Sequence, residues 1–404
     1  MPEPERAGGR PEPLRLLLFI DGLGSGGAQR QFVHLAIGLK QRGHRVTVAV
    51  YNDQDHFAPE IEGAGIEIVK VTRPGRFSFT PVITLARLYR AGSFDGVIAF
   101  LRTPAIIAEL ARALHPRMVV IAAERTTYPV LPLPFALAMT QRLHRLARFV
   151  TVNSAHHGKV MKRVFPELAD RVVVIRNGVA VPPKAQREAG LPHPGGALRL
   201  VAISSLMPYK NSLRLAEALA LLRNEYGLNV SVSWLGERFE GHTGHGVYEQ
   251  MSTLIDSLGV ADRWHWLGVT QDVAAVLDAH DALIHPSLYE GTSNAVCEAM
   301  AAGRPVIAGR VADHAEMLEQ TGAGMLFDPL DVRSIAEAIA RFASLDPAAR
   351  TAMGDRGRAV IEARYAFDTM VTSYERLARA ALSPGRTAFP ALSNGHGEAS
   401  RCAE

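Results

Sequence analysis

Short apolar runs alternate with longer amphipathic segments through most of the chain. The first half contains seven runs, at 14–20, 46–51, 66–71, 96–101, 117–123, 149–154 and 172–177, and the second contains six, at 198–204, 230–236, 264–268, 282–287, 305–309 and 324–327. Short runs bounded by polar turns predict strands, and the longer segments between them predict helices. Strands and helices in alternation form right-handed βαβ units with parallel sheets. The pattern therefore predicts an α/β fold.

A Pro- and Gly-rich segment at 180–197 divides this alternation into two blocks. We expect two doubly wound, Rossmann-like domains, at 14–183 and 184–383, which face each other across a cleft. The last helical pattern, at about 333–381, is expected to cross back and brace the first domain. In open parallel sheets ligands bind at the carboxyl ends of the strands, so the functional residues should lie on loops that follow strands in both blocks.

The composition is that of a soluble globular protein, with 48% hydrophobic and 21% charged residues. The ends at 1–13 and 384–404 are rich in Pro, Gly and Ser and predict disordered tails. Two distant cysteines, Cys297 and Cys402, make no disulfide framework or metal cluster, which favours a reducing compartment. The run at 14–20 is too short for a membrane span and follows an acidic leader, so we expect a cytoplasmic protein.

The formal net charge of +4 is unevenly distributed along the chain. Residues 14–183 carry a net charge of +11, whereas residues 184–383 carry −6. This asymmetry indicates an anionic partner for the first block, with solubility alone as the alternative explanation. The basic block contains no recognised nucleic-acid-binding motif, so nucleic acid is not an expected partner.

The loop that follows the first apolar run has the glycine spacing of a dinucleotide fingerprint. Gly22, Gly24 and Gly27 match G-x-G-x-x-G, in which the glycines allow a tight turn and the close approach of a pyrophosphate. Asp53 follows the next run, slightly late for an acid that binds ribose. A nicotinamide-dependent dehydrogenase is therefore one alternative, although an isolated fingerprint is weak evidence.

The segment 285–308 contains the densest set of candidate functional residues. A predicted strand ends before Glu290, and a helix opens near 292–294 and ends at Gly303, with Glu298 about two turns inside it. The free N–H groups and the dipole of such a helix suit a diphosphate, and the two carboxylates suit the hydroxyls of a sugar and a ribose. A capped surface helix with incidental glutamates is the alternative.

Lys210 lies in a second loop of the same kind, between a predicted strand and the helix that follows it. A lysine at the electropositive start of a helix loses dipole stabilisation. An anionic ligand is a physical reason to keep it there, and a solvated surface lysine is the alternative.

Together these segments resemble glycosyltransferase family 4. The E-x(7)-E motif of that family matches Glu290 and Glu298, within the surround PS-x-x-EG and EAMA-x-G-x-PVIA. Further similar segments extend the resemblance over nearly all of 14–380: the first βα loop at 19–30, the end of the first domain at 172–179, the nucleotide-base loop at 266–273 and a late turn at 324–331. The resemblance implies a GT-B fold and a metal-independent, retaining transferase, which uses a UDP- or GDP-sugar as donor and no cofactor.

The resemblance also assigns roles to residues. Glu290 would contact the transferred sugar near the reaction centre, Lys210 would hold the donor diphosphate and neutralise the leaving group, and Glu298 would bind the ribose. The other donor-binding candidates are Thr292, Ser293, Asn294, Gly26, Gly27, Ser205 and Glu316. Ser205 stands where the family usually has an arginine, so we expect a weaker diphosphate clamp, or one that another basic residue completes.

The acceptor is expected on the basic first domain, as in the family. The segment 134–150 spaces Arg142, Arg145 and Arg148 along one helical face, which suits a lipid-linked pyrophosphate or an anionic membrane at the inner face of the plasma membrane. An ordinary buried helix with a solvated arginine face is the alternative. Residues 119–129 resemble an ER-containing segment of family members that build surface polysaccharides on lipid carriers. The acceptor-binding candidates are Glu124, Arg125, Arg102, Arg142 and Arg145.

These observations predict a hexosyltransferase that extends a surface glycan or a glycolipid. Two alternatives stay open. A nucleotide-sugar epimerase or hydrolase on the same fold would turn over nucleotide sugar without an acceptor, and a dehydrogenase would bind NADH. No paired Asp-x-Asp ends a predicted strand, so we expect no metal site.

Overall fold

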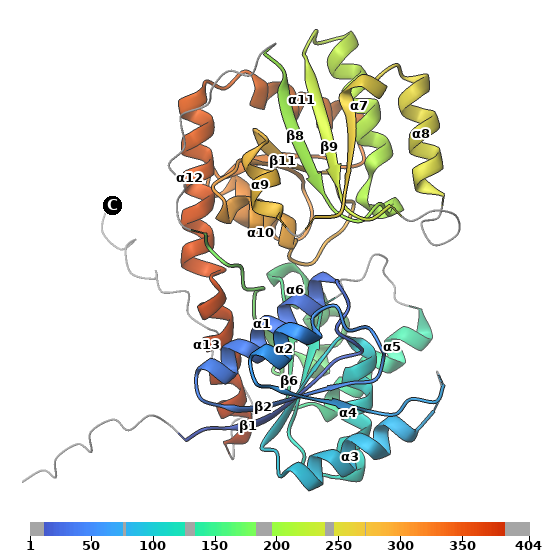
Figure 1. Cartoon of the computed structure of the whole chain (residues 1–404), viewed down its shortest axis with the longest axis vertical. Coiled ribbons are helices and arrows are strands. Elements are labelled where there is room, and N and C mark those ends of the chain that lie inside the picture. The colour runs from blue at the N-terminus through green and yellow to red at the C-terminus, as the bar shows by residue number, and fades with distance from the viewer. Residues whose placement is uncertain are drawn as a thin grey trace, which may run out of the picture.

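The computed structural model describes residues 12–75, 78–125, 134–182, 196–238, 246–270 and 272–383. These residues form two parallel sheets, each with helices on both faces, and Figure 1 shows the second domain above the first. The α/β class and the two doubly wound domains are thus confirmed, and every predicted apolar run coincides with a strand to within about three residues at either end.

The first sheet has the order β3-β2-β1-β4-β5-β6-β7. Its strands are β1 (Arg15–Phe19), β2 (Arg45–Val50), β3 (Glu67–Lys70), β4 (Gly96–Phe100), β5 (Val120–Glu124), β6 (Phe149–Val152) and β7 (Val172–Val174). The helices of this half are α1 (Gly27–Gln41), α2 (Ala58–Gly63), α3 (Thr80–Gly92), α4 (Arg102–Leu114), α5 (Phe135–Arg142) and α6 (Ala155–Val164).

The second sheet has the order β10-β9-β8-β11-β12-β13. Its strands are β8 (Leu198–Ile203), β9 (Val230–Leu235), β10 (Trp264–Gly268), β11 (Ala282–His285), β12 (Val306–Gly309) and β13 (Gly324–Phe327). Its helices are α7 (Ser212–Asn224), α8 (Val247–Ser257), α9 (Val273–Asp278), α10 (Asn294–Ala301), α11 (Val332–Ala343) and α12 (Pro347–Arg364), and α13 (Phe367–Leu382) follows them.

Burial on both faces explains why the central strands are apolar without alternation. In β1, Leu16, Leu17 and Leu18 are all buried, and their side chains divide between two hydrophobic clusters on opposite faces of the sheet. Parallel strands covered by helices on both sides require such continuous apolar runs. Within the described parts of the chain, no helix is both long and apolar enough to cross a membrane.

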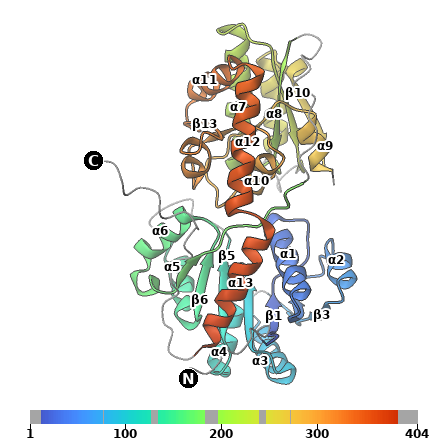
Figure 2. The same cartoon turned by 90° about the vertical axis from the view of Figure 1, so that its left-hand side faces the viewer.

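The expected single helical pattern at 333–381 is three helices, α11, α12 and α13. Figure 2 shows α12 and α13 end to end along one side of both domains. The chain bends between them at Tyr365 and Ala366, where Val179 donates to the Tyr365 carbonyl (2.9 Å) and accepts from the Phe367 amide (3.2 Å). The second domain therefore sends its last helix across to α1 of the first.

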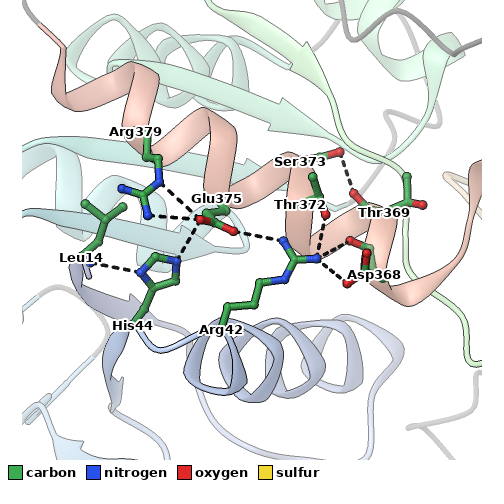
Figure 3. Close-up of polar contacts among 9 residues, drawn as sticks. All are labelled: Leu14, Arg42, His44, Asp368, Thr369, Thr372, Ser373, Glu375 and Arg379. Carbon is green, nitrogen blue, oxygen red and sulfur yellow. Dashed lines mark hydrogen bonds and ion pairs between the residues drawn. The ribbon is translucent and has the colours of Figure 1, made fainter. Parts of the chain in front are cut away.

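A polar cluster fastens α13 to the first domain (Figure 3). Arg42 donates to Glu375 (3.1 Å) and to Thr372 (2.7 Å) of α13, and it also contacts Asp368. His44 accepts from the Leu14 amide through Nδ1 (3.0 Å) and places Nε2 3.3 Å from Glu375. Because these contacts join the two ends of the chain, α13 is part of the first domain in three dimensions.

Candidate functional site

A cleft of about 410 Å³ lies between the two domains. Its walls are built from loops at the carboxyl ends of strands in both sheets, as expected for doubly wound folds. Nine residues predicted from the sequence line it: Gly27, Arg125, Ser205, Lys210, Glu290, Thr292, Ser293, Asn294 and Glu298.

Lys210 and Glu290 meet in this cleft as an ion pair. Lys210 Nζ donates to Glu290 Oε1 at 2.6 Å, and His285 Nε2 lies 3.0 Å from the same oxygen. Both charged side chains are 13% exposed. Burial alone would raise the pKa of Glu290, but the His285 hydrogen bond and the Lys210 charge outweigh it and hold that pKa well below its usual range. Glu290 is therefore a carboxylate.

Two loops are pinned together to create this pair. Tyr209 and Tyr289, which precede Lys210 and Glu290, stack with ring centroids 4.9 Å apart. Asn211 adopts a left-handed conformation (φ 63°) and donates to the carbonyls of Pro286 (3.0 Å) and Pro329 (2.7 Å). Asparagine tolerates this backbone region better than most residues. The short turn before α7 thus fixes the position of the lysine.

The N-terminus of α10 contacts the first domain across the cleft. Ser293 caps the helix by accepting from the Val296 amide (3.4 Å), and Thr292 donates to the Asn153 carbonyl (2.6 Å). Asn294 accepts from Asn177 (2.8 Å). The first turn of this helix therefore presents its free N–H groups between the two domains.

Gly27 belongs to the same junction. A Cβ atom on it would lie 2.7 Å from the side-chain nitrogen Nδ2 of Asn294, so a larger residue at this position requires the Asn294 side chain to move. The opening glycines at 22 and 24 have another explanation, because a Cβ on Gly24 would lie 2.9 Å from the side-chain oxygen of Gln54. Asp53 is exposed and pairs with Lys70 outside the cleft. Gly22 and Gly24 thus pack against Asn52 and Gln54, and Asp53 does not line the cleft.

Glu298 forms an ion pair with the opposite domain. Arg30 Nη1, on α1, donates to Glu298 Oε1 at 2.9 Å. Burial raises the pKa of Glu298, and the Arg30 charge opposes that rise. Sequence reasoning missed Arg30 as a site residue, although it lies one turn after Gly27 on a helix that starts at the predicted loop.

Three other cleft residues were also missed: His285, Asn153 and Asn177. Each lies at or shortly after the carboxyl end of a strand, and the rule that ligands bind there could have identified them. His285 opens the segment 285–308 and Asn177 lies in the segment 172–179, but neither was assigned a role, and Asn153 stands in neither segment.

Arg125 follows β5 and points into the cleft from the first domain. Its Nη1 donates to Asn177 Oδ1 at 3.0 Å, its Nη2 contacts the Tyr374 hydroxyl, and its guanidinium lies 4.3 Å from the ring centroid of Phe100. Its neighbour Glu124 is buried beneath and lies 3.1 Å from His144. Thus Arg125 lines the cleft and Glu124 supports the end of the strand.

Several predicted residues lie away from the cleft lining. Gly26 caps α1, and Glu316 pairs with Arg176 (3.1 Å) and Arg364 (3.5 Å). Arg102 is exposed at the start of α4. Their roles in binding donor or acceptor stay predictions.

The predicted basic helix over 134–150 is wrong in extent. The α-helix ends at Arg142, a 3₁₀ turn follows at Leu143–Leu146, and β6 begins at Phe149. The apolar β-branched run after Arg148 pairs with β5 and β7, which takes that arginine off the helical face. Arg142 and Arg145 are exposed, and membrane contact by this segment stays a prediction.

Two family models match the chain, one in each half. Residues 25–181 match Glycosyltransferase Family 4, and residues 197–344 match Glycosyl transferases group 1.

Relatives and solved structures agree with these matches. The chain is 32% identical over 164 residues to the MMP alpha-(1->4)-mannosyltransferase of Mycolicibacterium hassiacum (40% of this chain, 38% of that one). It is 24% identical over 367 residues to the GDP-mannose-dependent alpha-(1-6)-phosphatidylinositol monomannoside mannosyltransferase of Mycobacterium tuberculosis (84% and 90%). The chain spans about half the length, or less, of several such relatives. Its fold superposes on Anabaena Alr3699/HepE in complex with UDP with a TM-score of 0.76 (19% identity, 91% and 100% coverage).

Proposed function

Because the chain belongs to the glycosyltransferases, with a Family 4 domain joined to a group 1 domain on a GT-B fold, we propose that it moves a hexose from a nucleoside diphosphate sugar to a glycan or lipid-linked acceptor with retention of configuration. One observation carries the proposal. Lys210, Glu290, Glu298 and the N-terminus of α10 meet in a single cleft between the domains.

The difficult step of such a transfer is the departure of the nucleoside diphosphate. Negative charge develops on the phosphate as the bond to the sugar breaks, and a positioned cation with free helix N–H groups stabilises that charge. Lys210 and the first turn of α10 supply both. Glu290 accepts from Lys210 in the structure, so we infer that a bound diphosphate takes over this lysine and leaves Glu290 to face the transferred sugar.

We assign the ribose to Glu298, which lies on the same helix, α10. Its carboxylate already accepts a charge-assisted hydrogen bond from Arg30, and vicinal ribose hydroxyls are donors that satisfy the same oxygens. Arg30 then remains close to the diphosphate and is a candidate for the arginine that Ser205 replaces.

The donor and acceptor classes follow from chemistry and from the relatives. One similar solved structure is a complex with UDP, and one relative is named as GDP-mannose-dependent. We therefore propose a UDP- or GDP-sugar as the donor. The basic first domain and a relative named for a phosphatidylinositol mannoside favour a glycan or lipid-linked acceptor. We propose that transfer needs no metal, and we expect activity to persist in EDTA.

The proposal is tested first by ligand binding. In a thermal-shift panel of UDP-, GDP- and ADP-sugars, the donor should raise the melting temperature, because a ligand that binds only the folded state stabilises it. Turnover with candidate acceptors should then give a glycoside. Free sugar or an epimer in the absence of acceptor would instead identify the hydrolase or epimerase alternative.

Two substitutions test the site. Lys210→Ala and Glu298→Gln should each lower the rate of transfer by about 10²–10³-fold, because each removes a group that meets charge or hydroxyls of the donor. Rates are measured with saturating acceptor, and circular dichroism verifies folding. Glu319→Gln, which removes an exposed carboxylate that pairs with Arg310 away from the cleft, is the matched control. Wild-type turnover in both site variants would refute the assignment.

A further inference from the structure

The cations that line the cleft differ in whether they have a carboxylate partner. Lys210 has Glu290 as its partner, and Arg30 has Glu298. Within the described residues, Arg125 has no carboxylate partner: its contacts are the Asn177 side-chain oxygen, the Tyr374 hydroxyl and the Phe100 ring. The adjoining segment 126–133 contains no Asp or Glu either.

The burial of Arg125 makes the lack of a carboxylate partner energetically unfavourable. Its Nε atom is buried and has no hydrogen-bond partner in the described part of the chain. A cation that leaves water without an anion loses solvation that neutral dipoles only partly replace. Burial accordingly lowers the pKa of Arg125, and the Tyr374 hydroxyl only partly opposes the effect. Such a group is expected where a ligand supplies the missing charge.

A second positive element lies beside Arg125. Asn177 accepts from Arg125 and donates to Asn294, the first residue of α10 (2.8 Å). The guanidinium and the electropositive end of α10 are therefore one side chain apart. An anion between them would receive a forked arginine contact from one domain and free N–H groups from the other.

We propose that Arg125 binds a phosphoryl group of a ligand that enters the interdomain cleft. A phosphoryl group fits because it carries enough charge and enough acceptor oxygens for both the guanidinium and the helix end. This inference rests on the proposed function, which offers two sources of the group: the diphosphate of the sugar donor, or a phosphate on the acceptor.

Inorganic pyrophosphate is the probe, because its binding requires neither a sugar nor an acceptor. Isothermal titration calorimetry compares wild type with Arg125→Met, which keeps the bulk and removes the charge, and with Arg125→Lys, which keeps the charge. We expect the pyrophosphate affinity to fall at least about tenfold in Arg125→Met and by a smaller factor in Arg125→Lys, because lysine keeps the charge but loses the forked contact.

A repeat titration with saturating UDP or GDP identifies the source. If saturating nucleotide abolishes pyrophosphate binding, the phosphoryl group bound by Arg125 belongs to the donor. If binding persists and still depends on Arg125, that phosphoryl group belongs to the acceptor. Equal affinity in wild type and Arg125→Met, or no binding by wild type, overturns the proposal. If Arg125 only packs against its neighbours, Arg125→Met should bind pyrophosphate as tightly as wild type and should melt at a lower temperature.

Should Arg125→Met fail to fold, modification of wild type by phenylglyoxal gives an independent readout. Pyrophosphate should protect Arg125 in the peptide map, and unchanged modification overturns the proposal. A wild type that binds pyrophosphate through Arg125 but transfers no sugar would refute only the proposed function.

Discussion

At the scale of single residues, the cleft is organised by carboxylates that each accept from a basic side chain. Glu290 accepts from Lys210 and His285, and Glu298 accepts from Arg30. These contacts orient both carboxylates, and those of Glu290 also lower its pKa, whereas burial raises the pKa of Glu298. In the proposed reaction, hydroxyls and phosphates of the donor exchange with these partners at little reorganisation cost.

The ionised state of Glu290 makes a prediction about stability and pH. Its pKa is lower in the folded chain than its ordinary value of 4.5, so its contribution is fully present above pH 4.5 and is lost as pH falls towards the folded value. At pH 7, Glu290→Gln should lower the free energy of unfolding by about 3 kcal/mol, because it leaves Lys210 buried without an anion.

The difference in the free energy of unfolding between wild type and Glu290→Gln should shrink below pH 4.5, by about 1.4 kcal/mol per pH unit. Urea denaturation at pH 7 and pH 3.5 measures it. An equal gap at both pH values would show that the pair does not hold Glu290 ionised.

At the scale of elements, α13 contributes to the first domain although the chain reaches it last. Glu375 in its middle accepts from Arg42 and Arg379 and contacts His44. Burial alone would raise the pKa of Glu375, but these hydrogen bonds lower it. Its side chain is 20% exposed, whereas that of Asp368 is 86% exposed although it meets the same arginine.

This difference in exposure decides which contact stabilises the helix. Glu375→Gln should lower the free energy of unfolding by about 1 kcal/mol and speed amide exchange in α13, because a partly buried charge-assisted cluster is weakened. Asp368→Asn should change both far less, since water screens that pair. Hydrogen exchange with mass spectrometry and urea titration measure the two effects. Equal effects of the two substitutions would contradict this ranking.

At the scale of the whole molecule, polar contacts hold the two domains together across the cleft. Arg30 reaches Glu298, Thr292 reaches Asn153, and Asn177 reaches Asn294. The apolar clusters, by contrast, lie around the two separate sheets. Interfaces of this polar kind permit relative motion of the two domains.

Of these three contacts, the Arg30–Glu298 pair is the one that joins two charges. Its side chains are 40% and 22% exposed, so Arg30→Ala should cost at most about 1 kcal/mol of stability. It should nevertheless open the cleft and increase the radius of gyration in small-angle scattering. Arg310→Ala, which breaks an exposed pair with Glu319 inside the second domain, is the control. Identical scattering from Arg30→Ala and wild type would contradict the prediction.

The sequence by itself determined the elements and several of the residues that line the cleft. Apolar runs and helical periodicity act over a few neighbouring residues, so they placed every strand, and the spacing of Glu290 and Glu298 put both carboxylates on one loop–helix unit. The helical spacing over 134–150 was misleading, because the α-helix ends at Arg142 and a 3₁₀ turn leads into the predicted strand β6. The glycine spacing also suggested a dinucleotide loop where Gly22 and Gly24 pack against Asn52 and Gln54.

Only the tertiary structure decided which side chains meet. Arg30 and Glu298 are 268 positions apart, and Lys210 and Glu290 are 80 apart, so no local pattern could pair them. The unmatched charge of Arg125 is likewise visible only when its neighbours from β4, from the loop after β7 and from α13 are in place. The reason is physical. Periodicity is a property of a segment, whereas the balance of charge in a cleft depends on every element that closes around it.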